Sequence, residues 1–308
     1  MQQHVLISGA SGLIGSALST HLARLGFAVH ALERDNPAAR FNYSSASRQV
    51  ALDHSISLSA VINLAGPSIA DGRWTARRKQ ELLESRVDLT TALATALAAA
   101  PQPAALFLSA SAVGFYGEST LPLNEEAPAG DDYLASLATR WEAATAPARR
   151  VGIPTAHLRF GVVLSTKGGV LGKLMLPFSL CVGGKLGDGH QPMSWIALPD
   201  VLNLLTRLIE APAVLTAHTD SEGVSALNLV ADEPITNAVF TKALGRALHR
   251  PTPFPLPKSL IRLLFGEMGD ALLLGHSAVI SIRLSTLGYT LQYPSIDLAL
   301  DYLVKHKA

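Results

Sequence analysis

The chain has 308 residues, of which 48% are hydrophobic and 16% are charged, and its formal net charge is +1. This length favours one large domain with a smaller lobe, and the near-neutral charge excludes a general nucleic-acid or anionic-membrane surface. Because no stretch approaches about 18 uninterrupted apolar residues, the sequence predicts no membrane span.

The cellular environment is indicated by the cysteine content and by the first residues. Cys181 is the single cysteine and cannot form a disulfide within the chain. The first apolar run is too short for a secretory signal, and no basic region precedes it. We therefore expect a cytoplasmic protein that binds a small-molecule substrate and no nucleic acid or membrane, with a homodimer as the candidate assembly. The ten histidines show no spacing typical of a metal site.

A short apolar strand and a run of glycines open the chain. Residues 5–8 lead into glycines at positions 9, 12 and 15, and a helical pattern follows over 14–25. Glycines with this spacing between a strand and a helix are typical of a dinucleotide-binding turn, whose helix N-terminus offers free amides to a pyrophosphate. The residues of this turn that we expect to bind the cofactor are Gly9, Ser11, Gly12, Leu13, Ile14 and Gly15.

The end of the second predicted strand, residues 28–32, bears on the choice of cofactor. Glu33 and Arg34 follow it directly. A carboxylate here would hold the ribose hydroxyls of NAD(H) and repel a 2′-phosphate, whereas a guanidinium would pair with that phosphate bidentately. Because neighbouring strand residues face opposite sides, only one of the two should reach the ribose. We expect Arg34 to do so and NADP(H) to be preferred, with Glu33 and NAD(H) as the alternative.

Two more strand ends are expected beside the cofactor. The sequence predicts a third strand over 49–52, which Asp53 follows, and a fourth strand over 61–66. Asp53 could hydrogen-bond the adenine amine, and Gly66 permits a close approach of the backbone. The further residues that we expect to bind the cofactor are Asp53, Asn63, Ala65, Gly66 and Ser109.

The later elements continue the alternation of helices and strands. They are predicted over 74–100 (helix), 104–109 (strand), 133–149 (helix) and 155–164 (strand). This alternation predicts an α/β fold with a Rossmann-like, doubly wound parallel sheet. We expect residues 1–165 to form the dinucleotide-binding domain, with returning elements near 195–230. Residues 166–308 should form mainly a smaller C-terminal substrate lobe, because glycines and prolines crowd its irregular segments.

Motifs along nearly the whole chain match one protein family. The matching segments are residues 9–15, 61–87, 109–117, 141–142, 159–164, 187–196 and 234–267. Together they resemble the extended short-chain dehydrogenase/reductase superfamily, and within it an atypical epimerase-like family labelled nucleoside-diphosphate-sugar epimerase. The resemblance implies an NADP(H)-binding Rossmann-like domain, a substrate lobe and a family-specific C-terminal segment. It leaves the substrate open, with a nucleotide sugar as one candidate for a small polar substrate.

The catalytic pattern implied by the resemblance is incomplete in this chain. The superfamily uses serine, tyrosine and lysine, with the last two four residues apart on one helix. Ser111 aligns with the serine, but Tyr133 is followed four residues later by Leu137. No lysine lies between Glu118 and Thr166. Because an unassisted tyrosine has a pKa near 10, only about one in a thousand is ionised at neutral pH, and Tyr133 would be a poor general base.

Other residues could supply the missing chemistry. Tyr116 lies in a Gly-Phe-Tyr-Gly turn after the fifth strand, and Glu142 occupies the helix on which the lysine is missing. Tyr133 is either catalytic or packed on a helix face, and Glu142 is either an acid/base group or a solvated carboxylate. The residues that we expect to carry catalysis are Ser111, Tyr116, Tyr133 and Glu142.

The substrate is expected to meet a basic segment and a glycine-rich segment. Most basic residues within 73–86 should lie on a solvated helix face, while one or two could bind a phosphate or carboxylate. The residues expected to bind substrate are Arg73, Trp74, Lys79, Gln191 and Trp195. Two hypotheses remain. The elaborate lobe favours an NADP(H)-dependent oxidoreductase or epimerase, and the absent lysine favours a catalytically impaired NADP(H)-binding sensor or regulatory module.

Overall fold

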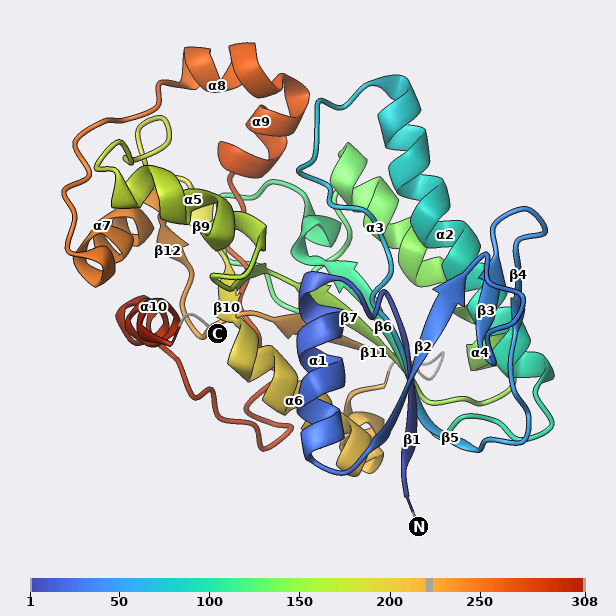
Figure 1. Cartoon of the computed structure of the whole chain (residues 1–308). Helices are drawn as coiled ribbons and strands as arrows, with labels where there is room; N and C mark the ends of the chain where they lie inside the picture. The colour runs from blue at the N-terminus through green and yellow to red at the C-terminus, as the bar shows by residue number, and fades with distance from the viewer. Residues whose placement is uncertain (1, 220–223, 307–308) are drawn as a thin grey trace.

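The computed structural model describes residues 2–219 and 224–306 (Figure 1). The strands are β1 (His4–Ser8), β2 (Ala28–Arg34), β3 (Asn42–Ser44), β4 (Gln49–Ala51), β5 (Leu58–Asn63), β6 (Phe107–Ala112), β7 (Thr155–Phe160), β8 (Val162–Leu164), β9 (Pro192–Met193), β10 (Trp195–Ala197), β11 (Val224–Leu229) and β12 (Ile235–Thr236). The α-helices are α1 (Leu13–Arg24), α2 (Ala76–Ala99), α3 (Tyr133–Ala143), α4 (Ala146–Arg150), α5 (Gly169–Ser179), α6 (Leu198–Glu210), α7 (Asn237–Leu248), α8 (Lys258–Phe265), α9 (Glu267–Leu273) and α10 (Ile296–Lys305). Short 3-10 helices are η1 (Val113–Tyr116) and η2 (Pro212–His218).

An eight-stranded sheet forms the centre of the molecule, in the order β11-β7-β6-β5-β1-β2-β3-β4. Its strands pair in parallel, except that β4 returns antiparallel to β3. The chain builds outward from β1 in both directions, first through β2 and then through β5. This reversal places a topological switch point at the carboxyl ends of β1 and β5, where open α/β sheets bind their ligands. The Rossmann-like fold predicted from the sequence is confirmed.

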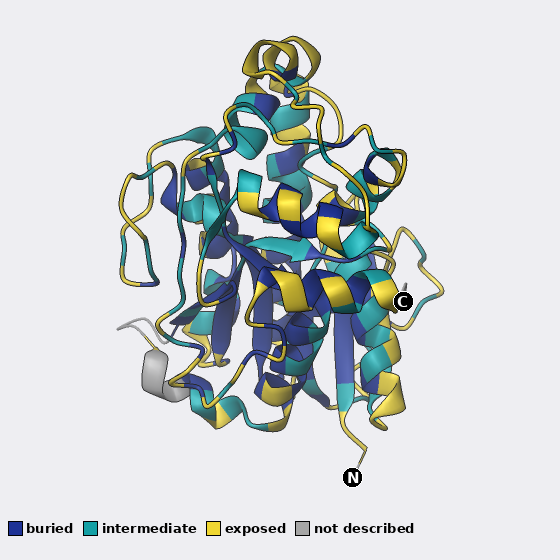
Figure 2. Cartoon of the chain, turned by 90° about the vertical axis from the view of Figure 1, so that its left-hand side faces the viewer, coloured by how far each residue is buried: buried dark blue, intermediate teal, exposed yellow. Residues whose placement is uncertain are grey.

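The sheet is buried on both faces because the side chains on both of its faces are mostly apolar. Val5 and Ile7 of β1 point into one core, which α1 and α6 complete. Leu6 points into the other core, together with side chains of α2 such as Leu93. Figure 2 shows the strands as the most buried part of the molecule. Continuous apolar strands of this kind are typical of a parallel sheet covered by helices on both sides.

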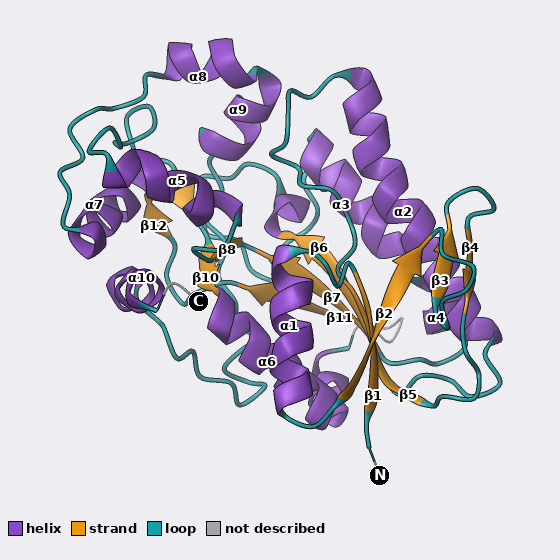
Figure 3. Ribbon diagram, in the orientation of Figure 1, coloured by secondary structure: helices purple, strands orange, loops and turns teal. Residues whose placement is uncertain are grey.

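A smaller set of elements lies beyond the carboxyl ends of the strands. Figures 1 and 3 show α5, α7, α8 and α9 gathered there, with α10 beside α7. Two short ribbons, β8 with β10 and β9 with β12, join these helices to the sheet. The C-terminal segment also returns to the sheet edge, where Asn228 of β11 donates from Nδ2 to the Ile280 carbonyl at 2.9 Å. The backbone edge of β11 is covered by Glu125, which accepts from the Asn228 amide at 3.1 Å, and by Arg283, which donates to the Ala226 carbonyl at 2.8 Å.

Several elements differ from the prediction. The strand expected over 49–52 is β4, the second arm of a hairpin whose first arm, β3, is too short to show periodicity. The strand expected over 155–164 divides at Gly161, where an added Cβ would lie 2.6 Å from the Ser194 oxygen. The helix expected over 133–149 divides into α3 and α4, because Pro147 lacks the amide that a continuous helix would need.

Candidate functional site

The glycine turn after β1 has the geometry expected of a dinucleotide-binding turn. Gly9 takes a positive φ of 71°, and the Gly12 amide donates to its carbonyl at 3.0 Å. Gly12 is the N-cap of α1. A Cβ on Gly15 would lie 2.1 Å from the Gly9 oxygen, so glycine is needed for α1 to begin this close to the turn. The first amides of α1 have no acceptor within the helix and are free to meet an anion at the switch point.

Two other segments border the glycine turn. The loop after β5 comes so close that a Cβ on Gly9 would lie 2.9 Å from the Ala65 nitrogen. From the other side, the Leu13 side chain lies 3.3 Å from the positions that Cβ atoms on Gly168 and Gly169 would take. The glycine turn, the β5 loop and the loop before α5 therefore surround the switch point together.

Glu33 and Arg34 at the end of β2 have different surroundings. The Glu33 carboxylate accepts a hydrogen bond from Asn36 Nδ2 at 2.7 Å, which holds it on the turn after β2. Arg34 lies two residues beyond the point where Leu32 pairs with Ser8 of β1, beside the start of the glycine turn. Its guanidinium makes no hydrogen bond or ion pair within residues 2–219 and 224–306. Arg34 is thus available to a ligand, while Glu33 is engaged.

Asp53 does not lie where the sequence predicted. Because β4 runs antiparallel to β3, its end points back toward the amino-terminal side of the sheet, away from the switch point. The Asp53 carboxylate accepts hydrogen bonds from the amide and hydroxyl of Ser55 at 3.0 and 2.6 Å, and lies 3.7 Å from Arg40 Nε. The expected contact with adenine is therefore wrong, and the unpredicted hairpin is the reason.

A row of polar side chains crosses the sheet near the carboxyl ends of its strands. The register places Asn63 between Ser8 and Ser109, and Ser109 beside His157. Ser8 donates to Asn63 Oδ1 at 2.6 Å, and Asn63 Nδ2 donates to Thr90 at 2.7 Å and to Ser109 at 3.3 Å. Asn63 and Ser109 are 0% and 1% exposed. Contrary to the prediction, their side chains hold the strand ends together and are not available to a cofactor.

Ser111 and Glu142 belong to a second polar cluster on the same face. Ser111 Oγ donates to Glu142 Oε1 at 2.7 Å, and Arg159 donates to both carboxylate oxygens at 2.8 and 2.9 Å. His157 Nδ1 lies 3.3 Å from Oε2. Burial would raise the pKa of Glu142, but the hydrogen bonds and charges of Arg159 and His157 hold that pKa at about 2. Glu142 is thus a buried carboxylate with several hydrogen bonds, and the solvated alternative for it is wrong.

Tyr116 extends this cluster toward β11. Its hydroxyl accepts a hydrogen bond from Arg159 at 2.9 Å and donates one to Asn228 Oδ1 at 2.7 Å. The side chain is buried, and this burial raises the pKa of the phenol even though Arg159 lies beside it. Tyr116 is therefore a neutral member of the interior network, and its proton is already donated to Asn228.

Tyr133 faces helix α2 rather than Ser111. Its hydroxyl donates to the Lys79 carbonyl at 3.2 Å, and its ring stands edge-on to Trp74 at 5.1 Å between centroids. Burial raises the pKa of Tyr133. The side of α3 that meets the end of β6 instead carries Leu134, which packs against Gly114. Of the two alternatives for Tyr133, packing on a helix face agrees with these contacts.

The expected substrate residues of the basic segment connect two parts of the protein. Arg73 donates to the last carbonyls of α8, and Lys79 Nζ lies 2.6 Å from the Glu267 carboxylate of α9. Trp74 is buried and donates from Nε1 to the Ile69 carbonyl at 2.9 Å. Arg73 and Lys79 thus join the segment before α2 and its first turn to α8 and α9. A contact of these three side chains with a substrate stays a prediction.

The expected substrate residues of the glycine-rich segment are also buried. Gln191 is 7% exposed, and its amide nitrogen donates to the carbonyls of Leu186 and Leu273 at 3.1 and 2.8 Å. Trp195 is 1% exposed and packs in the core that contains α6. Both residues pack at the junction with the sheet, but among the described residues Gln191 Oε1 and Trp195 Nε1 have no hydrogen-bond partner. Their contact with a substrate therefore stays a prediction.

Two family models match the sequence. The model described as the NAD dependent epimerase/dehydratase family matches residues 5–219, which include the glycine turn, the polar row and the buried Ser111 cluster. This chain belongs to the NAD dependent epimerase/dehydratase family. A domain of unknown function (DUF1731) matches residues 256–303, which cover α8, α9 and most of α10. The resemblance stated from the sequence motifs is confirmed.

Relatives in this epimerase family match nearly the full chain. Epimerase family protein Mb2239 of Mycobacterium bovis is 38% identical over 302 residues, covering 97% of this chain and 96% of its own. The crystal structure of human epimerase family protein SDR39U1 (isoform 2) with NADPH is 33% identical, with a TM-score of 0.87 and coverage of 98% and 99%. The crystal structure of the nucleoside-diphosphate sugar epimerase from Corynebacterium glutamicum is 32% identical, with a TM-score of 0.74, covering 98% of this chain and 59% of that one.

Sequence reasoning did not assign roles to several polar residues that complete the site in this epimerase-family protein. His157 and Arg159 of β7 and Asn228 of β11 hold the side chains of Ser111, Tyr116 and Glu142 through direct or shared contacts. A signal was present in the strand sequence. His157 and Arg159 alternate with apolar residues in a strand that is otherwise suited to burial on both faces. Polar side chains at every second position of such a strand indicate an internal polar network.

Two negative findings apply to the part of the chain that the structure describes. Within it, no group of three or more His, Cys, Asp or Glu side chains is placed to hold a metal ion. Its helices also include none with the length and apolar character required to span a bilayer.

Proposed function

We propose that this epimerase-family protein binds NADP(H) at the switch point, with the pyrophosphate on the glycine turn and the 2′-phosphate on Arg34. The uncommitted guanidinium of Arg34 carries this proposal. The two other arginines of the β2–β4 region have acidic partners, since Arg40 lies 3.7 Å from Asp53 and Arg48 lies 3.4 Å from Asp88. The NADPH in the human SDR39U1 structure supports the same cofactor.

Replacing Arg34 by alanine is expected to weaken NADPH binding about 10- to 100-fold and to leave NADH binding within about twofold of wild type. The reason is that a charge-assisted, bidentate pair with the 2′-phosphate contributes about 1.5–3 kcal/mol, and NADH lacks that phosphate. Titration calorimetry with both cofactors measures the effect. Arg48→Ala is the matched control because Arg48 is already paired with Asp88. An equal loss for both cofactors would contradict the assignment of Arg34.

The proposal extends to hydride transfer with a small polar substrate held between the strand ends and the lobe. Bound NADP(H) supplies the hydride chemistry. Ser111 directs its proton to Glu142, so its oxygen is left to accept a hydrogen bond from a substrate hydroxyl. The printed name of the Corynebacterium glutamicum structure supports a nucleotide sugar as one substrate class. The bonded state of both tyrosines indicates a proton route other than the usual tyrosine.

The bonded state of the expected catalytic residues also favours a second candidate function. Ser111, Tyr116, Tyr133 and Glu142 each hydrogen-bond to another residue of the chain, and burial raises the pKa of both tyrosines. A protein with this arrangement is suited to bind NADP(H) and report its level or redox state to a partner. Cofactor binding is common to both candidates, and turnover separates them.

A panel of hydroxyl- and carbonyl-bearing substrates, followed by the absorbance of NADPH, distinguishes enzyme from sensor. For the enzyme, we expect turnover that Ser111→Ala lowers by at least about 100-fold, with the dissociation constant of NADPH unchanged within twofold. Tight NADPH binding without turnover on the whole panel, together with a partner captured only in one redox state of the cofactor, would support the sensor instead.

A further inference from the structure

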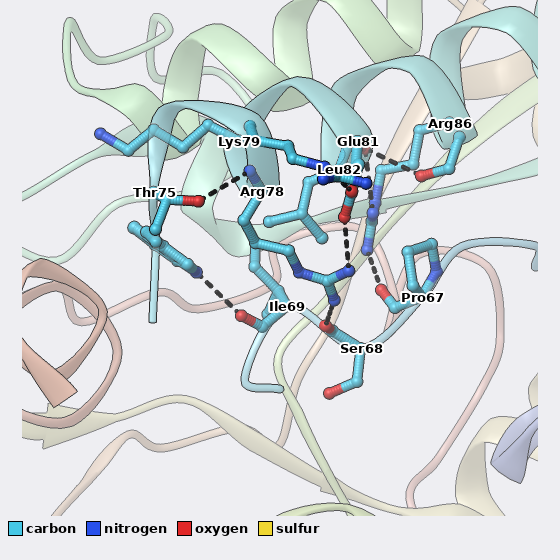
Figure 4. A network of polar contacts seen from close by, with 12 residues as sticks. Pro67, Ser68, Ile69, Thr75, Arg78, Lys79, Glu81, Leu82 and Arg86 are labelled. Carbon is cyan, nitrogen blue, oxygen red and sulfur yellow. Dashed lines mark hydrogen bonds and ion pairs between the residues drawn. The ribbon is translucent and has the colours of Figure 1, made fainter. Parts of the chain in front are cut away.

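Helix α2 and the residues before it hold three consecutive carbonyls of the loop after β5 (Figure 4). The donor–acceptor pairs are Arg86 to Pro67 at 2.8 Å, Arg78 to Ser68 at 2.9 Å and Trp74 to Ile69 at 2.9 Å. The same loop includes Ala65, whose nitrogen would lie 2.9 Å from a Cβ on Gly9 of the glycine turn. The basic segment singled out in the sequence thus fixes the backbone beside the switch point.

Arg86 differs from the other basic residues of this segment because it is buried without an acidic partner. It is 8% exposed, donates to the Leu82 carbonyl at 3.1 Å, and lies 5.1 Å from the Trp141 ring centroid. No carboxylate within residues 2–219 and 224–306 lies within ion-pair distance of its guanidinium. Burial lowers the pKa of Arg86 to about 10, so the group is still charged at neutral pH. Buried charges in proteins are usually paired, and a ligand can provide the missing partner.

The Arg86 guanidinium lies beside the backbone of Gly66. A Cβ on Gly66 would lie 3.1 Å from the guanidinium carbon and 3.3 Å from Nε and Nη2. Ala65, the preceding residue, is the one whose nitrogen would lie 2.9 Å from a Cβ on Gly9. The uncompensated charge is therefore separated from the glycine turn by little more than the backbone of Ala65 and Gly66. A side chain at position 66 would displace the guanidinium or move the loop.

We propose that Arg86 is a positioning residue that fixes the Gly66–Pro67 backbone and supplies a buried counter-charge for the pyrophosphate of the dinucleotide. This inference rests on the proposed binding of NADP(H). The other cations of α2 are less suited to this role, because Arg78 lies 3.4 Å from the Glu81 carboxylate and Lys79 is paired with Glu267. Since both nicotinamide cofactors carry the pyrophosphate, Arg86 acts on both, whereas Arg34 acts on NADPH alone.

The experiment compares Arg86→Lys with Arg86→Gln in the full chain. Both variants keep a donor for the Pro67 carbonyl, and only the lysine variant keeps the charge. Dissociation constants for NADPH and NADH are measured by calorimetry at low and high salt. We expect Arg86→Gln to weaken both cofactors about tenfold and to reduce the salt dependence, and Arg86→Lys to stay within about threefold of wild type. Arg78→Gln, with its charge already paired, is the matched control and should not change the salt dependence.

Either of two results would refute the role of Arg86 as a counter-charge for the pyrophosphate. The first is wild-type affinity in Arg86→Gln, and the second is an equal loss of affinity in both Arg86 variants with unchanged salt dependence. Thermal unfolding without ligand shows whether each variant is folded. If Arg86→Gln does not fold, Gly66→Ala gives a second readout, because its Cβ would displace the guanidinium while keeping the charge count. That variant should weaken NADPH and NADH by the same factor, and retained affinity for both would overturn the proposal. Failure of the wild-type protein to bind either cofactor would instead refute the proposed function.

Discussion

Replacing Glu142 by glutamine is expected to lower the free energy of unfolding by about 3–5 kcal/mol, as is typical when one partner of a buried ion pair is removed. Arg159 is 5% exposed and would be left charged in the interior. Ser111 and His157 would also lose their contacts with the carboxylate. Urea denaturation followed by circular dichroism measures the change at neutral pH.

Two comparisons test whether the loss comes from the buried charge. Glu267→Gln removes an ion pair whose glutamate is half exposed, and it should change the free energy of unfolding by less than about 1 kcal/mol. The double variant Glu142→Leu with Arg159→Met removes both charges and should regain most of the stability lost by Glu142→Gln. A Glu142→Gln protein as stable as the Glu267→Gln control would show that the carboxylate is not a buried counter-ion.

Acid should remove this stabilisation over a defined range of pH. The pKa of Glu142 is about 2 in the folded protein and near 4.5 ordinarily, so the unfolded chain takes up the proton first as the pH falls. The contribution is therefore complete above about pH 4.5 and is lost as the pH approaches 2. The stability difference between wild type and Glu142→Gln should be constant from neutral pH down to about 5 and then shrink. A difference that is unchanged at pH 3 would contradict the low pKa.

The local parts of the site could be predicted from the sequence. The strand, glycine turn and helix at residues 5–25 form a continuous segment, and their hydrophobic pattern and glycine spacing indicate the structure without distant contacts. The central strands were also predictable, since the strands predicted over 61–66 and 104–109 overlap β5 and β6 and differ from them by three residues at each end.

The interior hydrogen-bond network could not be predicted, because it depends on register between distant strands. Ser111 lies beside Arg159 of β7, and Arg159 lies beside Asn228 of β11, more than a hundred residues along the chain from Ser111. The sequence shows that these side chains are polar, but not that they meet. Asp53 was misplaced for a related reason: one short unpredicted strand, β3, reverses the direction of β4. A single direction error moves a residue from one end of a sheet to the other.

The basic segment shows a further limit of pattern reading. Arg77 is exposed at the start of α2, whereas Arg86 in the same helix is buried beneath the β5 loop. Both are arginines in one helix, so the sequence gives them the same propensity. Only the packing of α2 against α3 and the β5 loop distinguishes them. Most of these basic residues were expected to lie on a solvated helix face. Arg77 does so, and Arg86 does not.

Replacing Gly15 by alanine is expected to weaken both NADPH and NADH binding by at least about 100-fold, the loss of about 2.7 kcal/mol that follows when one or two charge-assisted hydrogen bonds to the pyrophosphate are broken. The added Cβ would lie 2.1 Å from the Gly9 oxygen and 2.9 Å from the Ala10 Cα, both of which are backbone atoms that cannot turn aside. The first turn of α1 must then move away from the glycine turn, and the amides that meet the pyrophosphate move with it. The same overpacking should lower the free energy of unfolding by about 1–3 kcal/mol.

Gly12→Ala is the matched comparison for Gly15→Ala. It distinguishes a clash inside the protein from a methyl group that blocks the approach of the ligand to the backbone. A Cβ on Gly12 would lie 3.3 Å from the Gly9 oxygen, and its backbone φ of −74° suits alanine. This variant should keep the thermal midpoint of the wild type while losing affinity for both cofactors, because the new methyl group lies where the pyrophosphate approaches the backbone. If Gly15→Ala bound NADPH as tightly as wild type, the close contact between α1 and the glycine turn would not be needed for binding. If Gly12→Ala kept full affinity, the cofactor would have to lie elsewhere than on this turn.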